Sequence, residues 1–311
     1  MATPKRITKA TLINIVDSAA KLTSGNAANY IPELAHIDED LIGIAIQQME
    51  HKVLTYSNKP LPDVTLQSVA KLIPLIGLLE EVGLDQLLQW VGAEPSGDEF
   101  SSITRLEQFG PKPSNPMLNA GAITLCSKIP GTGEQQFAWL ERWVMQLFNH
   151  RLSINPLVFN SEKRTGDRNR SLAFLLKSHG IIDGPVPEIL NVYFTLCSYE
   201  ASLEQLVMLP SLLANQGFCP IRKTRIISKE TARTTLSIMA TCGLYDETGT
   251  HMVQTGLPAK SGVSGYIIAV MPGIAGIACY SPKVNAKGNS IRGRAMLQQL
   301  AQLFGWHFAA R

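Results

Sequence analysis

The sequence of 311 residues lacks the short spacings that hold metals or cross-link small secreted domains. Its five cysteines include no Cys-x-x-Cys pair, and its six histidines include no His-x-x-x-His pair. Zinc sites and disulfide frameworks usually show such spacings. We therefore expect no metal site, and we expect the cysteines to be reduced and mostly buried.

The chain also lacks a large excess of either charge and has no long uninterrupted apolar run. Charged residues make up 17% of the chain and the net charge is +3, with no long Lys/Arg run, which argues against a nucleic-acid partner. The longest apolar stretch, residues 266–280, is broken by Pro272-Gly273, which argues against a membrane span. The basic N-terminal segment has no apolar signal region. We expect a cytoplasmic protein without a membrane partner.

Internal repeats and low-complexity linkers are absent, so residues 1–311 are interpreted as one unit. Strand-forming residues crowd 52–57, and two apolar runs, 266–271 and 274–280, flank a turn dipeptide as in an antiparallel hairpin. Strands near both ends with helices between them predict an α+β fold. Its sheet-containing part would be 1–64 with 222–311, and its mainly helical part 65–221. Helical periodicity marks 66–79, 85–90, 135–148, 200–214, 228–239 and 290–304.

Ser68-Val-Ala-Lys71 is a pattern that could form a catalytic site. Residues three apart share a helix face, so the lysine amine can reach the serine hydroxyl. A lysine whose pKa is lowered by burial or by a second cation can activate a serine as a nucleophile. Residues 61–65 offer helix caps that would place Ser68 in the first turns. The motif is weak alone, because Ser18-Ala-Ala-Lys21 matches it in a helix that looks structural.

Lys260-Ser261-Gly262 precedes the predicted hairpin and strengthens this interpretation. Serine acyl-transfer enzymes with Ser-x-x-Lys carry Lys-[Ser/Thr]-Gly on a strand opposite the nucleophile. Small residues let the backbone approach the substrate, and the second lysine adds positive potential near the first. No Gly-x-Ser-x-Gly elbow and no phosphate-binding glycine loop occurs.

Longer blocks of the sequence resemble the serine-dependent glutaminases, and this resemblance runs from about residue 30 to 289. It implies a β-lactamase/transpeptidase-like fold, with an antiparallel sheet flanked by helices and a helical domain. The blocks are 30–35, 67–71, 115–123, 161–162 with 167–169, 193–198, 215–220, 242–246 and 256–263.

The resemblance implies hydrolysis of L-glutamine without a cofactor, in a homodimer or homotetramer. It implies Ser68 as nucleophile, Lys71 as its activating partner and Tyr245 as proton relay, with the backbone N–H groups of Ser68 and Val263 as the oxyanion hole. Lys260, Ser261 and Gly262 would support the site. The implied substrate-binding residues, besides Ser68, Tyr245 and Val263, are Tyr30, Gln67, Asn119, Glu162, Asn169 and Tyr193.

Two other functions stay open: another serine acyl hydrolase on the same fold, and a non-catalytic amino-acid-binding protein. Taken singly, the tyrosines would be core or rim aromatics, Glu162 a surface acid and Asn119 a helix cap. The sequence also departs from the family pattern twice. Tyr266 stands where a second glycine is common, and residues 97–102 have serine where asparagine is frequent.

Overall fold

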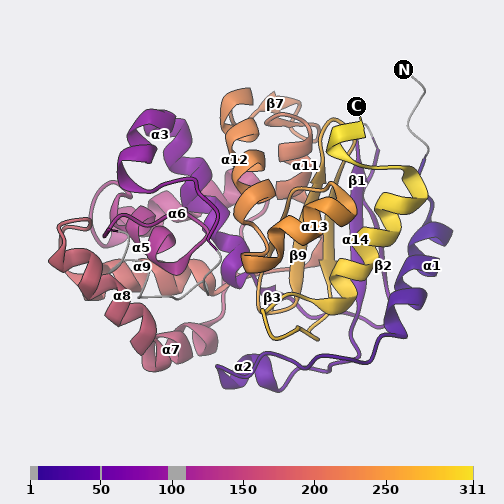
Figure 1. Cartoon of the computed structure of the whole chain (residues 1–311), viewed down its shortest axis with the longest axis horizontal. Coiled ribbons are helices and arrows are strands. Elements are labelled where there is room, and N and C mark those ends of the chain that lie inside the picture. The colour runs from indigo at the N-terminus through magenta and orange to yellow at the C-terminus, as the bar shows by residue number, and fades with distance from the viewer. Residues whose placement is uncertain (1–5, 50, 97–109, 311) are drawn as a thin grey trace.

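The computed structural model describes residues 6–49, 51–96 and 110–310 (Figure 1). The serine-for-asparagine departure at 97–102 lies outside these residues. In Figure 1 helices α3 and α5–α9 gather on one side of the molecule, and the main sheet lies on the other.

The main sheet has five antiparallel strands in the order β2-β1-β10-β9-β8. The predicted hairpin and the strand predicted at 52–57 are confirmed, and β8 is a strand at the Lys-Ser-Gly motif, whereas β1 was not predicted. Successive side chains of a strand point to opposite faces. Ile44, Ile267 and Ile277 accordingly contact α1 and α14 on one face, while Ala45, Ile268 and Ala278 belong to the larger core on the other. The strands are β1 Gly43–Gln48, β2 Leu54–Ser57, β8 Ala259–Ser261, β9 Tyr266–Met271 and β10 Ala275–Tyr280.

Helices cover both faces of this sheet. Helices α1 and α14 pack together on one face, and α10 and α11 pack on the other. Among the described helices, none combines the length and apolar character that crossing a membrane requires. The helices are α1 Lys9–Ala20, α2 Pro32–Ala35, α3 Leu72–Trp90, α5 Asn119–Ser127, α6 Glu134–Phe148, α7 Pro156–Thr165, α8 Asp167–Ser178, α9 Val186–Cys197, α10 Leu203–Leu206, α11 Met208–Ala214, α12 Lys229–Cys242, α13 Thr248–Thr255 and α14 Ile291–Phe304.

Short elements connect the sheet to the helices. A three-stranded sheet has the order β3-β5-β4, and β6 pairs with β7. The short strands are β3 Val64–Thr65, β4 Ser153–Ile154, β5 Tyr199–Ala201, β6 Phe218–Cys219 and β7 Thr224–Arg225, and the 3₁₀ helices are η1 Gln67–Lys71, η2 Tyr245–Glu247 and η3 Phe308–Ala310.

One local prediction holds only in part and another is wrong. Most of 200–214 is helical, as α10 and α11, but residues 200–201 end β5, and a Ser202 capping box starts the first of the two helices after the strand. Residues 61–65 supply no helix cap, since Val64–Thr65 pair with β5 and η1 begins after Leu66 without a side-chain cap. All five cysteines are buried and free, as predicted.

Gly276 is where β10 and α11 come closest. A Cβ built on this residue would lie 2.5 Å from the Pro210 carbonyl carbon and would collide with the Ser211 backbone. Real side-chain carbons do not approach backbone atoms this closely, so the helix can cover the sheet only where the strand has glycine.

We expect Gly276→Ala to lower the free energy of unfolding by about 2 kcal/mol, because the new methyl group pushes α11 off the sheet. Urea unfolding measures this. Gly249→Ala is the matched control, since open space surrounds that exposed helical glycine. Alanine there should be neutral or stabilise by up to about 1 kcal/mol. Equal stability of the two variants would contradict the close packing.

Candidate active site

A cavity of about 330 Å³ lies between η1, the helices α5 and α7–α9, and the loop after β8. Its size suits a small molecule. Lys71, Tyr245 and Lys260–Gly262 lie behind its walls. The predicted residues that line it are Tyr30, Gln67, Ser68, Asn119, Glu162, Asn169, Tyr193 and Val263, and Thr165, Gly166, Arg168 and Cys197 line it without having been predicted.

Ser68 enters the cavity from the strained first turn of η1, directly after β3. The preceding Gln67 has φ +46°, a left-handed conformation that side chains rarely adopt. The turn is held by Leu66, whose N–H donates to Tyr199 O at 2.7 Å. A Cβ on Gly262 would lie 2.7 Å from Leu66 O, so only glycine lets β8 end against this turn. This contact gives the Lys-Ser-Gly motif a structural reason.

Tyr245 contacts the nucleophile candidate directly. It too has a left-handed backbone, with φ +55°. Burial raises the pKa of its phenol, and hydrogen bonds with Ser68 and Ser261 oppose that rise. The phenol is therefore protonated at neutral pH and lies within hydrogen-bonding reach of the Ser68 hydroxyl.

Lys71 is fully buried, and its amine is held towards α5. Its Nζ donates to Met117 O at 2.9 Å and to Asn119 Oδ1 at 2.6 Å. No hydrogen bond joins Lys71 to Ser68 within the described part of the chain. Burial lowers the pKa of the amine to about 8. A fraction of this lysine is therefore neutral and basic near physiological pH.

Lys260 is a second fully buried lysine. Its Nζ lies 4.8 Å from the centroid of the Tyr245 ring and donates to Ser261 O at 2.5 Å. Burial, together with the positive charge of Lys71, lowers its pKa well below the usual value. Tyr245 is thus packed between Lys260 on one side and Ser68 on the other.

An acidic group occupies one wall of the cavity. Glu162 is 5% exposed, and its Oε1 accepts a hydrogen bond from the Tyr30 hydroxyl at 2.8 Å. That hydroxyl also lies 2.5 Å from Gln67 Oε1. Burial raises the pKa of Glu162, and the hydrogen bond from Tyr30 opposes the rise. A carboxylate in this setting favours a cationic partner.

Neutral polar groups occupy another wall. Asn119 begins α5, where Leu118 rather than Asn119 is the N-cap, and its Nδ2 donates to Asn169 Oδ1 at 2.9 Å. The side chain of Asn119 thus links Lys71 to Asn169. Tyr193 is 3% exposed, and burial raises the pKa of its phenol. These amides and this phenol can bind an anion without a buried cation.

Comparison with known proteins shows the family of this chain. A glutaminase family profile matches residues 25–308. A glutaminase from Legionella pneumophila (strain Corby) is 65% identical over 305 residues, which are 98% of either chain. The chain belongs to the glutaminase family. The resemblance found in the sequence is therefore confirmed.

Glutaminase structures also share the fold. The probable glutaminase ybaS superposes with a TM-score of 0.91 at 33% identity, over 97% of this chain and 99% of its own. Mglu in its glutamate form superposes with a TM-score of 0.92 at 28% identity, over 98% of this chain and 70% of its own. The predicted fold class is confirmed by these neighbours.

Tyr266, where the glutaminase pattern commonly has glycine, points away from the cavity. The side chain is 1% exposed, and its hydroxyl donates to Ala201 O at 2.6 Å. Its ring packs against Tyr280 on the neighbouring strand, with the ring centroids 5.1 Å apart. The departure from the family pattern therefore changes the sheet interior and not the cavity wall.

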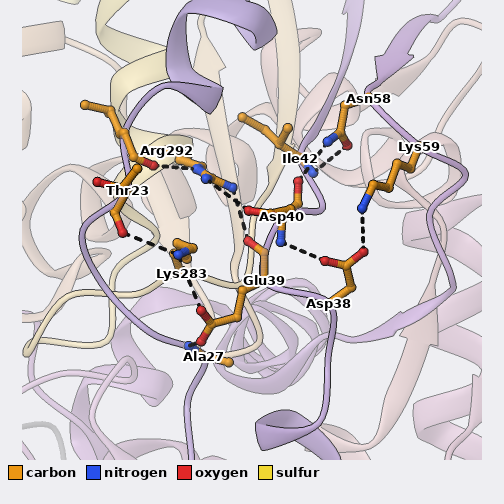
Figure 2. A network of polar contacts seen from close by, with 11 residues as sticks. Thr23, Ala27, Asp38, Glu39, Asp40, Ile42, Asn58, Lys59, Lys283 and Arg292 are labelled. Carbon is orange, nitrogen blue, oxygen red and sulfur yellow. Dashed lines mark hydrogen bonds and ion pairs between the residues drawn. The ribbon is translucent and has the colours of Figure 1, made fainter.

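The segment of residues 22–40, here called the strap, carries Tyr30 and is clamped near both ends (Figure 2). Glu39 accepts a hydrogen bond from Ala27 N at 2.8 Å and lies 3.4 Å from the Lys283 amine. The buried Arg292 donates to Leu22 O at 2.9 Å and to Glu39 O at 3.1 Å. The strap is thus closed on itself and fixed to α14. Nothing in the local sequence pattern predicted this clamp.

We expect Glu39→Ala to accelerate amide hydrogen exchange in the strap about tenfold, because the variant removes the acceptor for Ala27 and the ion pair with Lys283. Exchange measured by mass spectrometry over residues 22–40 tests this. Lys59→Ala is the control, since it removes only the ion pair with Asp38 between half-exposed side chains. Unchanged strap exchange in Glu39→Ala would contradict the clamp.

Proposed function

We propose that this protein hydrolyses the side-chain amide of L-glutamine to L-glutamate and ammonia through a glutamyl ester on Ser68. Its family makes it an amidohydrolase acting on glutamine. The observation that carries the mechanism is the contact of Ser68 with Tyr245 beside a cavity with an acidic wall and a neutral polar wall, with the buried Lys71 on the same 3₁₀ helix as Ser68. The glutamate form of the similar protein Mglu supports a glutamate-sized ligand.

The two walls match the two ends of the amino-acid backbone. Glu162 and Tyr30 bind the α-ammonium group, because charge-assisted hydrogen bonds to a carboxylate are stronger than neutral ones. Gln67 completes this end through its side-chain oxygen. Asn119, Asn169 and Tyr193 bind the α-carboxylate with neutral donors. The side-chain amide is then directed towards Ser68.

The reaction starts with attack of Ser68 Oγ on the amide carbon. Lys71 is the base, and Tyr245 relays protons between Ser68 and the departing nitrogen. The N–H groups of Ser68 and Val263 stabilise the oxyanion by about 3 kcal/mol each. The C–N bond breaks as ammonia takes the relayed proton. Water, deprotonated by the same base, hydrolyses the ester and returns Ser68.

Lys260, Ser261 and Gly262 support these groups without touching the substrate. Lys260 and Ser261 flank the Tyr245 phenol, and Gly262 allows β8 to reach the Ser68 turn. We further propose a homodimer or homotetramer. Apolar side chains that remain exposed on the monomer, such as Leu157 at 64% and Phe174 at 57%, support this assembly.

We expect Ser68→Ala to reduce ammonia release from glutamine by at least about 10³-fold, because the variant has no nucleophile. Ser18→Ala is the matched control: it alters the other Ser-x-x-Lys match, on the exposed face of α1, and should retain full activity.

Ammonia release from glutamine and asparagine, and opening of a chromogenic β-lactam, should be measured side by side. Activity on glutamine alone separates a glutaminase from other serine hydrolases of this fold. Substantial glutamine hydrolysis by Ser68→Ala would contradict the acyl-enzyme. Glutamine binding without hydrolysis by the wild type would favour the amino-acid-binding alternative.

The low pKa of Lys71 also sets an expected pH dependence. The amine is protonated below about 8 and neutral above it. Because only the neutral form accepts a proton, kcat should rise about tenfold per pH unit below this value and level off above it. Initial rates with saturating glutamine test this. Lys71→Met should lose most activity at every pH, and a flat profile through pH 8 in the wild type would contradict the role of Lys71.

A further inference from the structure

A second cavity, of about 200 Å³, lies on the other side of Val263 from the first. It is bounded by the strap and α2, by β3 and β5, by α7, and by the segments before β9 and after β10. Its described lining residues are Ala28, Glu33, Leu34, Ile37, Pro62, Asp63, Val64, Thr65, Asn155, Val158, Glu200, Val263, Ser264, Tyr280 and Pro282.

Four residues that line the second pocket each have a buried side-chain oxygen without a hydrogen-bond partner. Among the described residues, no hydrogen-bond partner exists for Glu33 Oε2, Thr65 Oγ1, Ser264 Oγ or Tyr280 OH. Thr65 is 3% exposed, Ser264 4% and Tyr280 0%. Buried polar atoms in folded proteins nearly always have a partner. These four oxygen atoms come from four separate elements. They indicate that a ligand or ordered water supplies the missing hydrogen-bond partners.

The charge around the second pocket is negative. Glu33, Asp63 and Glu200 line it, and none of its described lining residues is Lys, Arg or His. None of these carboxylates forms an ion pair with a described residue. Glu200 accepts a hydrogen bond from Asn155 Nδ2 at 2.7 Å, and Glu33 accepts one from Ser161 Oγ at 2.9 Å.

One positive group, Arg164, is connected to the second pocket indirectly. Arg164 Nη2 donates to Ser161 Oγ at 3.3 Å, and Ser161 in turn donates to Glu33. The second oxygen of Glu33 is left for another donor. The pocket therefore favours a cation that donates hydrogen bonds.

The rest of the second pocket is apolar, which restricts what that cation can be. Leu34, Ile37, Val64 and Val158 provide aliphatic walls. Within the described chain, no three His, Cys, Asp or Glu side chains are arranged to hold a metal ion. A volume of 200 Å³ equals that of about six or seven waters at roughly 30 Å³ each. A ligand with a charged head and a short aliphatic stem matches both surfaces.

We propose that the second pocket binds a small aliphatic amine in its ammonium form. The ammonium group donates to the unpartnered oxygens, and the methylene groups lie against the aliphatic walls. A diamine of about six heavy atoms places a second cation near the remaining carboxylates. This site lies outside the glutamine-hydrolysing machinery and goes beyond the proposed function.

Binding there is coupled to the active site by shared walls. Val263 lines both cavities, and Ser161, which holds Glu33, is adjacent in sequence to Glu162. An occupied second pocket should therefore change the rate of glutamine hydrolysis without competing with glutamine.

Calorimetric titration of the full chain with 1,4-diaminobutane and n-butylamine tests the proposal. The probes are compared with 1,4-butanediol and 1-butanol at constant ionic strength. The amines should bind and the uncharged analogues should not, with the diamine the tighter. Binding of none of the four compounds, or equal binding of amines and alcohols, would overturn the proposal. The pocket would then be one that holds ordered water.

Variants assign the binding to the pocket. Glu200→Gln and Asp63→Asn should each weaken diamine binding about tenfold, since each removes one charge that attracts the ligand. Glu188→Gln, an equal change on an exposed turn of α9, should bind as the wild type does. Because Asp63 is exposed, its variant should fold normally.

The active site provides the decisive comparison. Glu162→Gln should leave diamine affinity within about twofold, because the proposed site does not use that carboxylate. Loss of binding in Glu162→Gln with retention in Glu200→Gln would place the amine in the active site and overturn the proposal. These titrations do not depend on turnover, so failure of the proposed function would show separately, as a wild type that does not hydrolyse glutamine or as a Ser68→Ala variant that still does.

Discussion

The organisation of the active site depends on the burial of the Lys71 amine. A buried ammonium group is costly unless it is hydrogen-bonded, and here Met117 O and Asn119 Oδ1 accept from it. The same burial lowers the pKa of the amine to about 8. Asn119 in turn donates a hydrogen bond to Asn169 in α8, so the position of Asn169 also depends on Lys71. One buried amine thus orients two side chains of the cavity, and its lowered pKa leaves part of it neutral near physiological pH, as the proposed role of a base requires.

Two of the five described non-glycine residues with a left-handed backbone lie at or beside the proposed catalytic groups. Gln67, beside Ser68, and Tyr245 both have left-handed backbones. Such conformations persist only where the surroundings enforce them. The ladder of β3 and β5 holds the first turn, and the close approach of Gly262 to Leu66 keeps β8 beside it. Lys260 packs on the Tyr245 ring from that same strand. Strand β8 therefore packs against both strained segments, the turn at Gln67 and the backbone at Tyr245.

The strap joins the two cavities. Tyr30 covers the first with a 46% exposed side chain whose hydroxyl points inward, while Ala28, Glu33, Leu34 and Ile37 line the second. Ion pairs and hydrogen bonds with Arg292 and Lys283 hold the ends of the strap (Figure 2). Its middle is held by an apolar cluster of Ile31, Leu34 and Val158 and by hydrogen bonds to α7. The strap is therefore fixed along its length between the two cavities.

Sequence alone determined the elements whose period is unambiguous, such as α6, α14 and the β9–β10 hairpin, because each has one repeating apolar pattern. It also determined the family and most residues of the cavity wall, since these lie in long specific blocks. The strand β1 was missed because it is buried on both faces and shows no alternation. Only the tertiary structure decided that Lys71 contacts Asn119, that Glu39 closes the strap, and that four residues with unpartnered oxygens line a second pocket. Each of these depends on atoms that are distant in the chain and are brought together by packing, which local patterns do not encode.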